Sequence, residues 1–372
     1  MKFLHISDLH IGKVLNGISL IPDQAHIFAQ IIAYIQTHQP QAIVIAGDVY
    51  DRALPSAEAV SLFDQFITDL AAQGVVVLLV AGNHDSPQRM DYASRLLVQN
   101  HLHFAGAFKG AMEKVTLTDP HGEVNFWLLP FIKPLLTREV LEDIDTYDGI
   151  ITAAISNSAI DFTQRNVLIS HQFYTKMGEE STRSESERDP IGGLDGVDAT
   201  IVQGFDYVAL GHLHGQQRVG EEHIRYSGSP LKYSFSEVNQ AKAVLMVDIG
   251  EKGQVQTTAL PLAPLHDMEI IEGTMETLLE STSENYIKAI FTNEEYILDP
   301  MGKLRVNYPN IMEAVPKKSL AETISGEGAD LNAITQLSTY ELFAEFFLNT
   351  QGSTLTAEQA DIIVKLLEED VE

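Results

Sequence analysis

Five apolar runs in the first 214 residues share one pattern: each is rich in β-branched side chains and ends abruptly in polar ones. The runs are FLHISDLH (3–10), AIVIAGDVYD (42–51), VVVLLVAGNHD (75–85), NVLISH (166–171) and YVALGHLH (207–214). Short, continuous apolar runs of this kind are typical of strands that are buried on both faces. The pattern therefore predicts five core strands, each followed by polar side chains.

Helical patterns separate the first three runs. Apolar residues recur at helical spacing over 27–35 and over 60–70, and Pro40 and Gly74 mark the ends of these stretches. Strands that alternate with helices predict an α/β sheet, and such sheets bind ligands beyond the carboxyl ends of their strands. We therefore expect the polar ends of the runs to gather at one sheet edge.

The pattern changes in the second half of the chain. Alternating apolar residues in AKAVLMVDIG and GQVQTTALPL predict a hairpin that closes the first domain, and two prolines at 261 and 264 mark its boundary. The segment 178–193 shows no apolar periodicity and is predicted to be an exposed loop. The predicted domains are 1–265, a small α+β capping domain over 266–336 and a helical partner-binding segment over 337–372.

Composition narrows the class of protein. The chain has 372 residues, 45% of them hydrophobic, which is enough for a large core. We find neither an apolar stretch of 18 residues nor a signal-peptide pattern, so we expect no membrane association. Cysteine is absent, which excludes thiolate nucleophiles and thiolate metal sites and is compatible with a cytoplasmic protein.

The formal net charge is −28, and the excess of acid is uneven. From Asp267 onward the sequence holds 21 acidic and 6 basic residues, so this last part contributes −15 of the total. Such a balance argues against a broad basic surface for nucleic acid. Any site for a polyanion must therefore be local.

The residues that end the five runs can bind metal ions. Aspartate at a strand end usually makes a turn or caps a helix, and a single histidine there is usually structural. Here carboxylates, imidazoles and one amide come together without sulfur, which suits two hard or borderline divalent cations such as Mn²⁺, Mg²⁺, Fe²⁺ or Zn²⁺. The candidate ligands are Asp8, His10, Asp48, Asn83, His171, His212 and His214.

The predicted ions suggest the reaction. Two cations about 3.5–4 Å apart can activate water, bind a phosphate oxygen and offset charge, which fits the hydrolysis of a phosphate ester. His84 exceeds the ligand count, and an imidazole beside the metals can protonate the leaving oxygen. Asp51 follows Asp48 by three residues and is predicted to orient that imidazole.

The ends of the five apolar runs resemble the motifs of a known family. The strings DLH, GDVYD, GNHD, SH and GHLH, in this order, resemble the five motifs of the calcineurin-like metallophosphoesterase superfamily. Within it, HISDLHIGK, GDVYDRALP, AGNHDSPQR and IRYSGSPLKYSFSE resemble the bacterial SbcD nuclease subunits. The resemblance implies an α/β fold of two facing mixed sheets flanked by helices, followed by a small capping domain and C-terminal helices.

The resemblance also implies roles for the ligands. Asp48 would bridge two ions, of which relatives favour Mn²⁺. One ion would be held by Asp8, His10, Asp48 and His214, and the other by Asp48, Asn83, His171 and His212.

The implied activity is a DNA exonuclease and endonuclease that acts in repair and recombination. It would cut double-stranded ends, hairpins and single strands, as a homodimer within a heterotetramer with SbcC, a coiled-coil ATPase. The candidate DNA contacts are Lys13, Arg52, Arg89 and Lys176.

Two alternatives remain open from the sequence. A phosphatase or small-substrate phosphodiesterase is one, because GDVYDR resembles the GDxxDRG signature of serine/threonine phosphatases; however, Ala53 replaces its glycine, and GNHD stands where those enzymes have GNHE. A non-catalytic scaffold is the other, which missing ligands would favour. In this sequence every predicted ligand and His84 are present.

Overall fold

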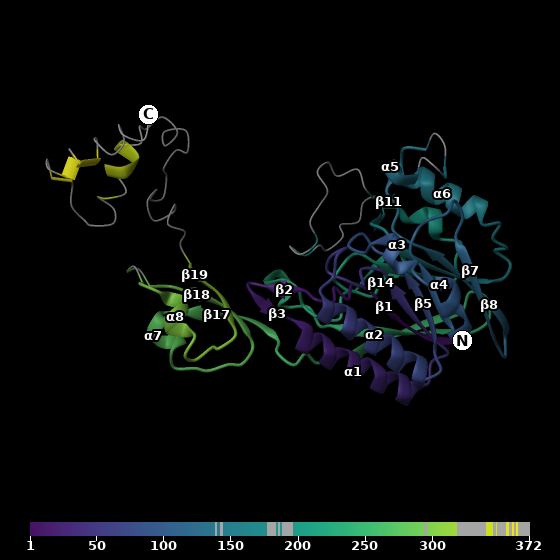
Figure 1. Cartoon of the computed structure of the whole chain (residues 1–372), viewed down its shortest axis with the longest axis horizontal. Helices are drawn as coiled ribbons and strands as arrows, with labels where there is room; N and C mark the ends of the chain where they lie inside the picture. The colour runs from purple at the N-terminus through teal and green to yellow at the C-terminus, as the bar shows by residue number, and fades with distance from the viewer. Residues whose placement is uncertain are drawn as a thin grey trace. The chain divides into compact units, whose positions relative to one another are not determined.

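The structure is a computed structural model of the chain. It describes residues 1–137, 140–141, 144–176, 184, 187, 196–293, 295, 297–317, 340–344, 347, 355–356, 359–360 and 362–363. The chain folds into two compact units, and Figure 1 shows both. The first unit comprises Met1–Ile270 with Glu284–Ile287, and the second comprises Ile271–Ser283 with Lys288–Glu372.

Two six-stranded sheets form the first unit. The first sheet has the order β16-β15-β1-β4-β5-β6, in which β1, β4, β5 and β6 are parallel and β15 runs antiparallel to both of its neighbours, β1 and β16. Its strands are β1 (Lys2–Ile6), β4 (Ala42–Ala46), β5 (Val76–Val80), β6 (Leu102–Ala105), β15 (Ala243–Ile249) and β16 (Val255–Pro261). The register pairs Phe3 with Ala42 and Ala42 with Val76.

The second sheet has the order β13-β14-β12-β9-β8-β7. Its four inner strands are parallel, and the edge strands β7 and β13 run antiparallel to their neighbours. The strands are β7 (Glu113–Asp119), β8 (Gly122–Leu129), β9 (Arg165–His171), β12 (Tyr207–Gly211), β13 (Gln217–Val219) and β14 (Glu221–Tyr226). Tyr207 pairs with Val167, which aligns the ends of β9 and β12.

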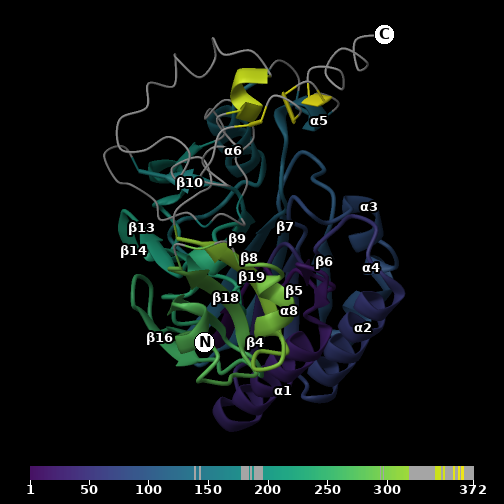
Figure 2. The same cartoon turned by 90° about the vertical axis from the view of Figure 1, so that its left-hand side faces the viewer.

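The core lies between the two sheets. Phe3 of β1 packs edge-on against Phe126 of β8 and Tyr207 of β12, with ring centroids 5.4 and 5.8 Å apart. Helices α1 (Ile21–His38) and α2 (Ala57–Ala72) cover the other face of the first sheet (Figure 2) and are joined by the stacked rings of Phe28 and Phe66. Helix α6 (Tyr147–Asn157) packs on the outer face of the second sheet. This sandwich fixes the strand ends rigidly.

Shorter elements complete the first unit. They are β2 (Val14–Leu15), β3 (Ile18–Ser19), α3 (Pro87–Met90), α4 (Ser94–Leu97), α5 (Pro134–Thr137), β10 (Tyr174–Thr175), β11 (Val197–Asp198) and 3₁₀ turns at Val98–Asn100, Ala199–Val202 and Phe235–Glu237. Residues 268–316 form an α+β arrangement: the sheet β17-β18-β19 with two short helices. Its elements are β17 (Met268–Gly273), α7 (Met275–Leu278), β18 (Tyr286–Phe291), α8 (Pro300–Leu304) and β19 (Ile311–Pro316).

The predicted strands, helices and closing hairpin are confirmed, with two differences. The five runs form strands of two facing sheets, three in the first sheet and two in the second. Their polar ends therefore do not lie at the edge of one sheet. Val60, which the periodicity placed on the apolar stripe of α2, is 46% exposed because Ala59, Phe63 and Phe66 form the buried face instead.

Two predicted segments lie largely outside the described residues. Of the loop 178–193 only Ser184 and Glu187 are described, and of the helical segment 337–372 only a few positions are. Among the described helices, none is long and apolar enough to cross a membrane.

Candidate metal centre

The candidate site lies where β1, β4 and β5 of the first sheet and β9 and β12 of the second come to an end. Four of its residues have left-handed backbone conformations, with φ of 53° at Asp8, 42° at His10, 50° at Asp48 and 110° at His212. Such φ values are uncommon for residues other than glycine and cluster at functional sites. The loops after β1 and β4 are joined by hydrogen bonds from Asp8 N to Gly47 O and from His10 N to Asp48 O, both 3.0 Å.

Glycines allow the loops to approach one another closely. A Cβ atom added at Gly82 would lie 2.1 Å from Asp48 Oδ1, and one added at Gly47 would lie 2.2 Å from His171 Nδ1. Real Cβ atoms do not come so near to other heavy atoms, so both positions require glycine. This explains the glycine that precedes the polar residues in GDVYD and GNHD.

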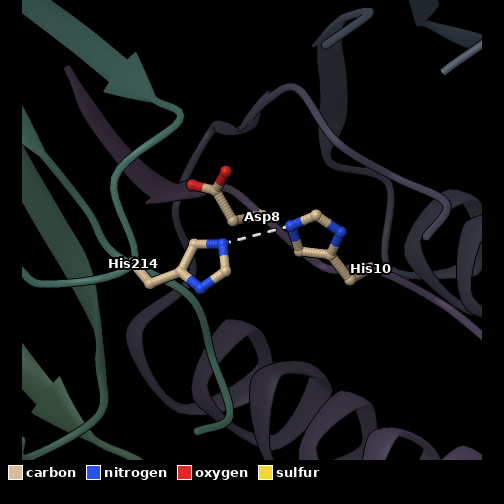
Figure 3. A group of neighbouring side chains, drawn as sticks. All are labelled: Asp8, His10 and His214. Carbon is tan, nitrogen blue, oxygen red and sulfur yellow. Dashed lines mark hydrogen bonds between the residues drawn. The ribbon is translucent and has the colours of Figure 1, made fainter. Parts of the chain in front are cut away.

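Asp8, His10 and His214, together with Asp48, form what we name the first cluster. Figure 3 shows that Asp8 and His10 come from the end of β1 and meet His214 from the segment after β12. The Nε2 atoms of His10 and His214 lie 3.2 Å apart. The carboxylate of Asp8 accepts the main-chain N–H of His212 at 3.0 Å. All four side chains of the cluster are buried.

Asp48, Asn83, His171 and His212 form the second cluster. The amide oxygen of Asn83 lies 3.0 Å from His171 Nε2 and 3.0 Å from His212 Nδ1. His171 Nδ1–H donates to the carbonyl oxygen of Ala46 at 2.7 Å, so Nε2 is the nitrogen that this ring presents to the cluster. The amide oxygen from the end of β5 thus lies 3.0 Å from a ring nitrogen at each of the ends of β9 and β12.

Asp48 belongs to both clusters. Its Oδ2 lies 3.7 Å from His10 Nε2 and 3.3 Å from His171 Nε2. Burial by itself would raise the pKa of Asp48, but the imidazoles of His171, His10 and His84 hold that pKa well below its usual value. The carboxylate is therefore ionised and lies between the two sets of ligands.

The donor set fits divalent cations. Ligand atoms in neighbouring positions around an ion with bonds of ~2.1 Å are roughly 3 Å apart, which matches the separations of 3.0–3.7 Å found within both clusters. Among the residues that the structure describes, none forms a hydrogen bond with the buried Nδ1 of His10, although a histidine ligand usually has such a partner. Nitrogen and oxygen donors without sulfur favour hard or borderline ions over soft ions such as Cu(I).

Comparison with known proteins identifies the family. Residues 1–216, more than half of the chain, match the family model of the calcineurin-like phosphoesterases. The chain belongs to the calcineurin-like phosphoesterase family. Residues 264–351 match a second model, described as the C-terminal domain of a type 5 capsule protein repressor. The predicted family and fold class are thus confirmed, and the chain is a phosphoesterase.

Curated relatives match almost the whole phosphoesterase. The SbcD component of the nuclease SbcCD from Staphylococcus epidermidis is 33% identical over 380 residues, covering 99% of this chain and 98% of the relative. The protein of the same name from Staphylococcus saprophyticus is 32% identical over 378 residues, with the same coverage. The resemblance to SbcD nuclease subunits is therefore confirmed. Among solved structures, a dimetal phosphatase from Danio rerio matches at 13% identity and a TM-score of 0.38, covering 71% of this chain and 99% of the other.

His84 of the phosphoesterase lies beside the first cluster, but its orienting contact differs from the prediction. The ring packs edge-on against His10, with centroids 4.8 Å apart, and its Nδ1–H donates to the main-chain carbonyl oxygen of Asp51 at 2.9 Å. The carboxylate of Asp51 binds Lys13 at 2.8 Å and lies 3.6 Å from His10 Nδ1. The backbone of Asp51 replaces its side chain because the carboxylate is already engaged by the lysine.

Sequence reasoning did not identify three buried charged residues around the phosphoesterase centre. Asp85 accepts hydrogen bonds from the main chain of Val49, Tyr50 and Gly82 at 2.8–3.1 Å and so ties the loops after β4 and β5 together. Burial raises the pKa of this carboxyl to about 6. Asp85 is the last residue of the GNHD motif, and its position there could have marked it as a functional residue. Glu237 and Lys242 contact His214; Glu237 ends the string IRYSGSPLKYSFSE, which marked its segment but not its contact, and Lys242 lies outside every motif.

Proposed function

We propose that this chain is the nuclease subunit of an SbcCD-type complex and hydrolyses DNA phosphodiesters with two divalent cations, preferably Mn²⁺. One observation carries the proposal: seven nitrogen and oxygen donors from five strand ends converge on two adjoining clusters in a chain that aligns along 99% of its length with curated nuclease subunits. The first cluster would hold one ion and the second the other, with Asp48 shared.

The residues around the clusters divide the chemistry. Bound cations would supply Lewis-acid stabilisation of the phosphate charge and activation of water. The Nδ1–H of His84 donates to the Asp51 carbonyl, which leaves Nε2 to carry a second proton. The leaving oxygen can take that proton. Gly47 and Gly82 keep Asp48 and His171 in place by allowing close packing. The proton donor and the ligands thus come from different loops of one rigid frame.

Local basic residues offset the acidity of the chain. Lys13 binds Asp51 beside the first cluster, and Arg52, 78% exposed on its side chain, lies 3.6 Å from the same carboxylate. We propose that Arg52 contacts the phosphate backbone near the scissile bond, because its guanidinium reaches solvent beside Asp51, whose main-chain carbonyl accepts the Nδ1–H of His84. Arg89 and Lys176 remain candidate contacts to the DNA backbone.

Exposed apolar side chains support a homodimer. Tyr92, Leu96 and Val98 stand out from the segment around α4, and Val60 stands out from α2. Helix α2 contacts β5 and α4 contacts β6, the neighbouring strand at the edge of the first sheet, so these side chains come from elements near the same edge. We propose that a second copy of this chain covers them, since exposed apolar groups gathered on one side mark interaction surfaces.

The dimer predicts a change in mass on substitution. Leu96→Asp should convert a dimer into a monomer in light-scattering measurements at micromolar concentration, because a buried unpaired carboxylate is costly. Leu298→Asp is the matched control, since Leu298 is similarly exposed, at 71% against 69%, but lies in the second unit. A dimer that survives Leu96→Asp, or a monomeric parent chain, contradicts the proposed surface.

An SbcC-type coiled-coil ATPase is the proposed partner. The names of the curated relatives place them in SbcCD complexes, and this chain spans 98% of their length. The segment 337–372 is the proposed contact; because most of it lies outside the described residues, the structure gives this contact no geometry.

A cleavage assay tests the function. The metal-stripped chain should nick a hairpin DNA and digest DNA ends only after Mn²⁺ is added, and an SbcC-type partner with ATP should increase the rate. Turnover of phosphopeptides or cyclic nucleotides without cleavage of DNA would favour the phosphatase or small-substrate alternative. Tight binding to the partner without any turnover would favour the scaffold.

A further inference from the structure

The segment 224–242, which begins with the string IRYSGSPLKYSFSE (224–237), has no part in the proposed ligand sets, yet it lies against the first cluster. Ser227 Oγ is 2.8 Å from Ser7 Oγ, which donates to the carboxylate of Asp8. The ring of Tyr233 packs edge-on against His10, with centroids 5.3 Å apart, and its hydroxyl donates to the carbonyl of Leu9. The distinctive string therefore supports the ligands of this cluster.

Glu237 makes the most direct of these contacts. Its Oε1 lies 3.3 Å from His214 Nδ1, and its side chain is fully buried. An ionised carboxylate can only accept hydrogen bonds, so the contact places the proton of His214 on Nδ1. The lone pair of His214 is then on Nε2, the atom that faces His10 Nε2 at 3.2 Å.

Lys242 pairs with this carboxylate. Its Nζ donates to Glu237 Oε2 at 2.6 Å, to the carbonyl of His214 at 2.9 Å and to Ser229 Oγ at 2.9 Å. The two oxygens of Glu237 thus contact an imidazole N–H and an ammonium, which are the partners that a buried carboxylate needs.

The second cluster is oriented differently. His171 donates its Nδ1–H to the main-chain carbonyl of Ala46, and no side chain is involved in that bond. The Nδ1–H of His171 is thus held by the main chain of β4, whereas Nδ1 of His214 contacts a carboxylate 23 residues along the chain. A substitution can therefore remove the side-chain contact of His214 and leave the main-chain contact of His171 intact.

We infer that Glu237, paired with Lys242, is a positioning residue that orients His214 toward a divalent cation and sets the affinity of the first cluster for its ion. The inference rests on the proposed function, because it takes the clusters as metal sites. It assigns the distinctive string a role in ion binding and not in recognition of DNA.

Titration of the metal-stripped chain with Mn²⁺, followed by electron paramagnetic resonance of the free ion, tests the inference. The parent chain should bind two ions. Glu237→Ala should weaken one of the two sites by about 10–100-fold, the range found when the hydrogen-bond partners of ligands are removed, and leave the other unchanged. Glu237→Gln keeps an acceptor oxygen in place and should show a smaller loss at the same site. Glu58→Ala, which removes an exposed carboxylate from α2, should change neither.

Thermal unfolding of the metal-stripped variants separates positioning from stability. If Glu237→Ala fails to fold, Glu237→Gln decides the question. Folded variants that bind both ions like the parent chain overturn the inference, and so does an equal loss at both sites. A parent chain that binds fewer than two ions contradicts the proposed function itself, which keeps the two failures distinct.

Discussion

Asp48→Ala should abolish turnover and lower the Mn²⁺ content of both sites. The Asp48 carboxylate approaches ring nitrogens of both clusters, 3.7 Å from His10 Nε2 and 3.3 Å from His171 Nε2. It also accepts the main-chain N–H of His84 at 2.8 Å, so its loss loosens the loop that carries the proposed proton donor. One substitution thus affects two ion sites and a third catalytic element.

Two matched variants sharpen this test. Asp48→Asn keeps the shape of the side chain and an oxygen for the His84 N–H, and should still lose most ion binding because the negative charge is gone. Asp64→Ala, on the exposed face of α2, should bind ions and cut DNA like the parent chain. Elemental analysis that finds two ions per chain in folded Asp48→Ala would overturn the shared role of Asp48.

His84→Ala should lose most nuclease activity and keep both ions. Loss of a general acid typically lowers the rate by about 10²–10⁴-fold, and we expect kcat to fall by that amount with little change in KM. The Nδ1–H of His84 is bound to the Asp51 carbonyl, and its ring packs on His10 without belonging to the proposed ligand sets.

The Mn²⁺ content of His84→Ala also shows whether His84 is a proton donor or a metal ligand. Nitrogen and oxygen atoms of His10, Asp48 and His84 all lie within 4.8 Å of one another, so a third metal-competent group exists among the described residues. Parallel Mn²⁺ titrations of His84→Ala and the parent chain decide between the roles. A lower ion content in the variant shows that His84 holds an ion, and a substrate with a good leaving group should then fail to restore its rate.

The assignment of Asp51 illustrates how far motif spacing can be trusted. Its position three residues after Asp48 correctly brought it close to His84, since both belong to loops at the same end of the first sheet. Spacing could not tell whether the side chain or the main chain makes the contact. That depended on Lys13, which comes from a different loop and takes the carboxylate at 2.8 Å.

The apolar runs and their polar ends determined much by themselves. Burial on both faces demands continuous apolar runs, so β1, β4, β5, β9 and β12 could be located from the positions of those runs. The types of residue at their ends limited the chemistry to hard or borderline cations. Both properties depend only on residues that are neighbours in the sequence, so they can be predicted without the tertiary structure.

The tertiary structure decided which local features meet. Periodicity reports that a strand is buried but not which sheet it joins, so the division of the five ends between two facing sheets was invisible in the pattern. The contact of Glu237 with His214 was equally hidden, because the two residues are far apart in sequence and only the packing of segment 224–242 against the first cluster brings them to 3.3 Å. Long-range pairing follows from the closure of the whole core, and that closure fixes the orientation of each ligand.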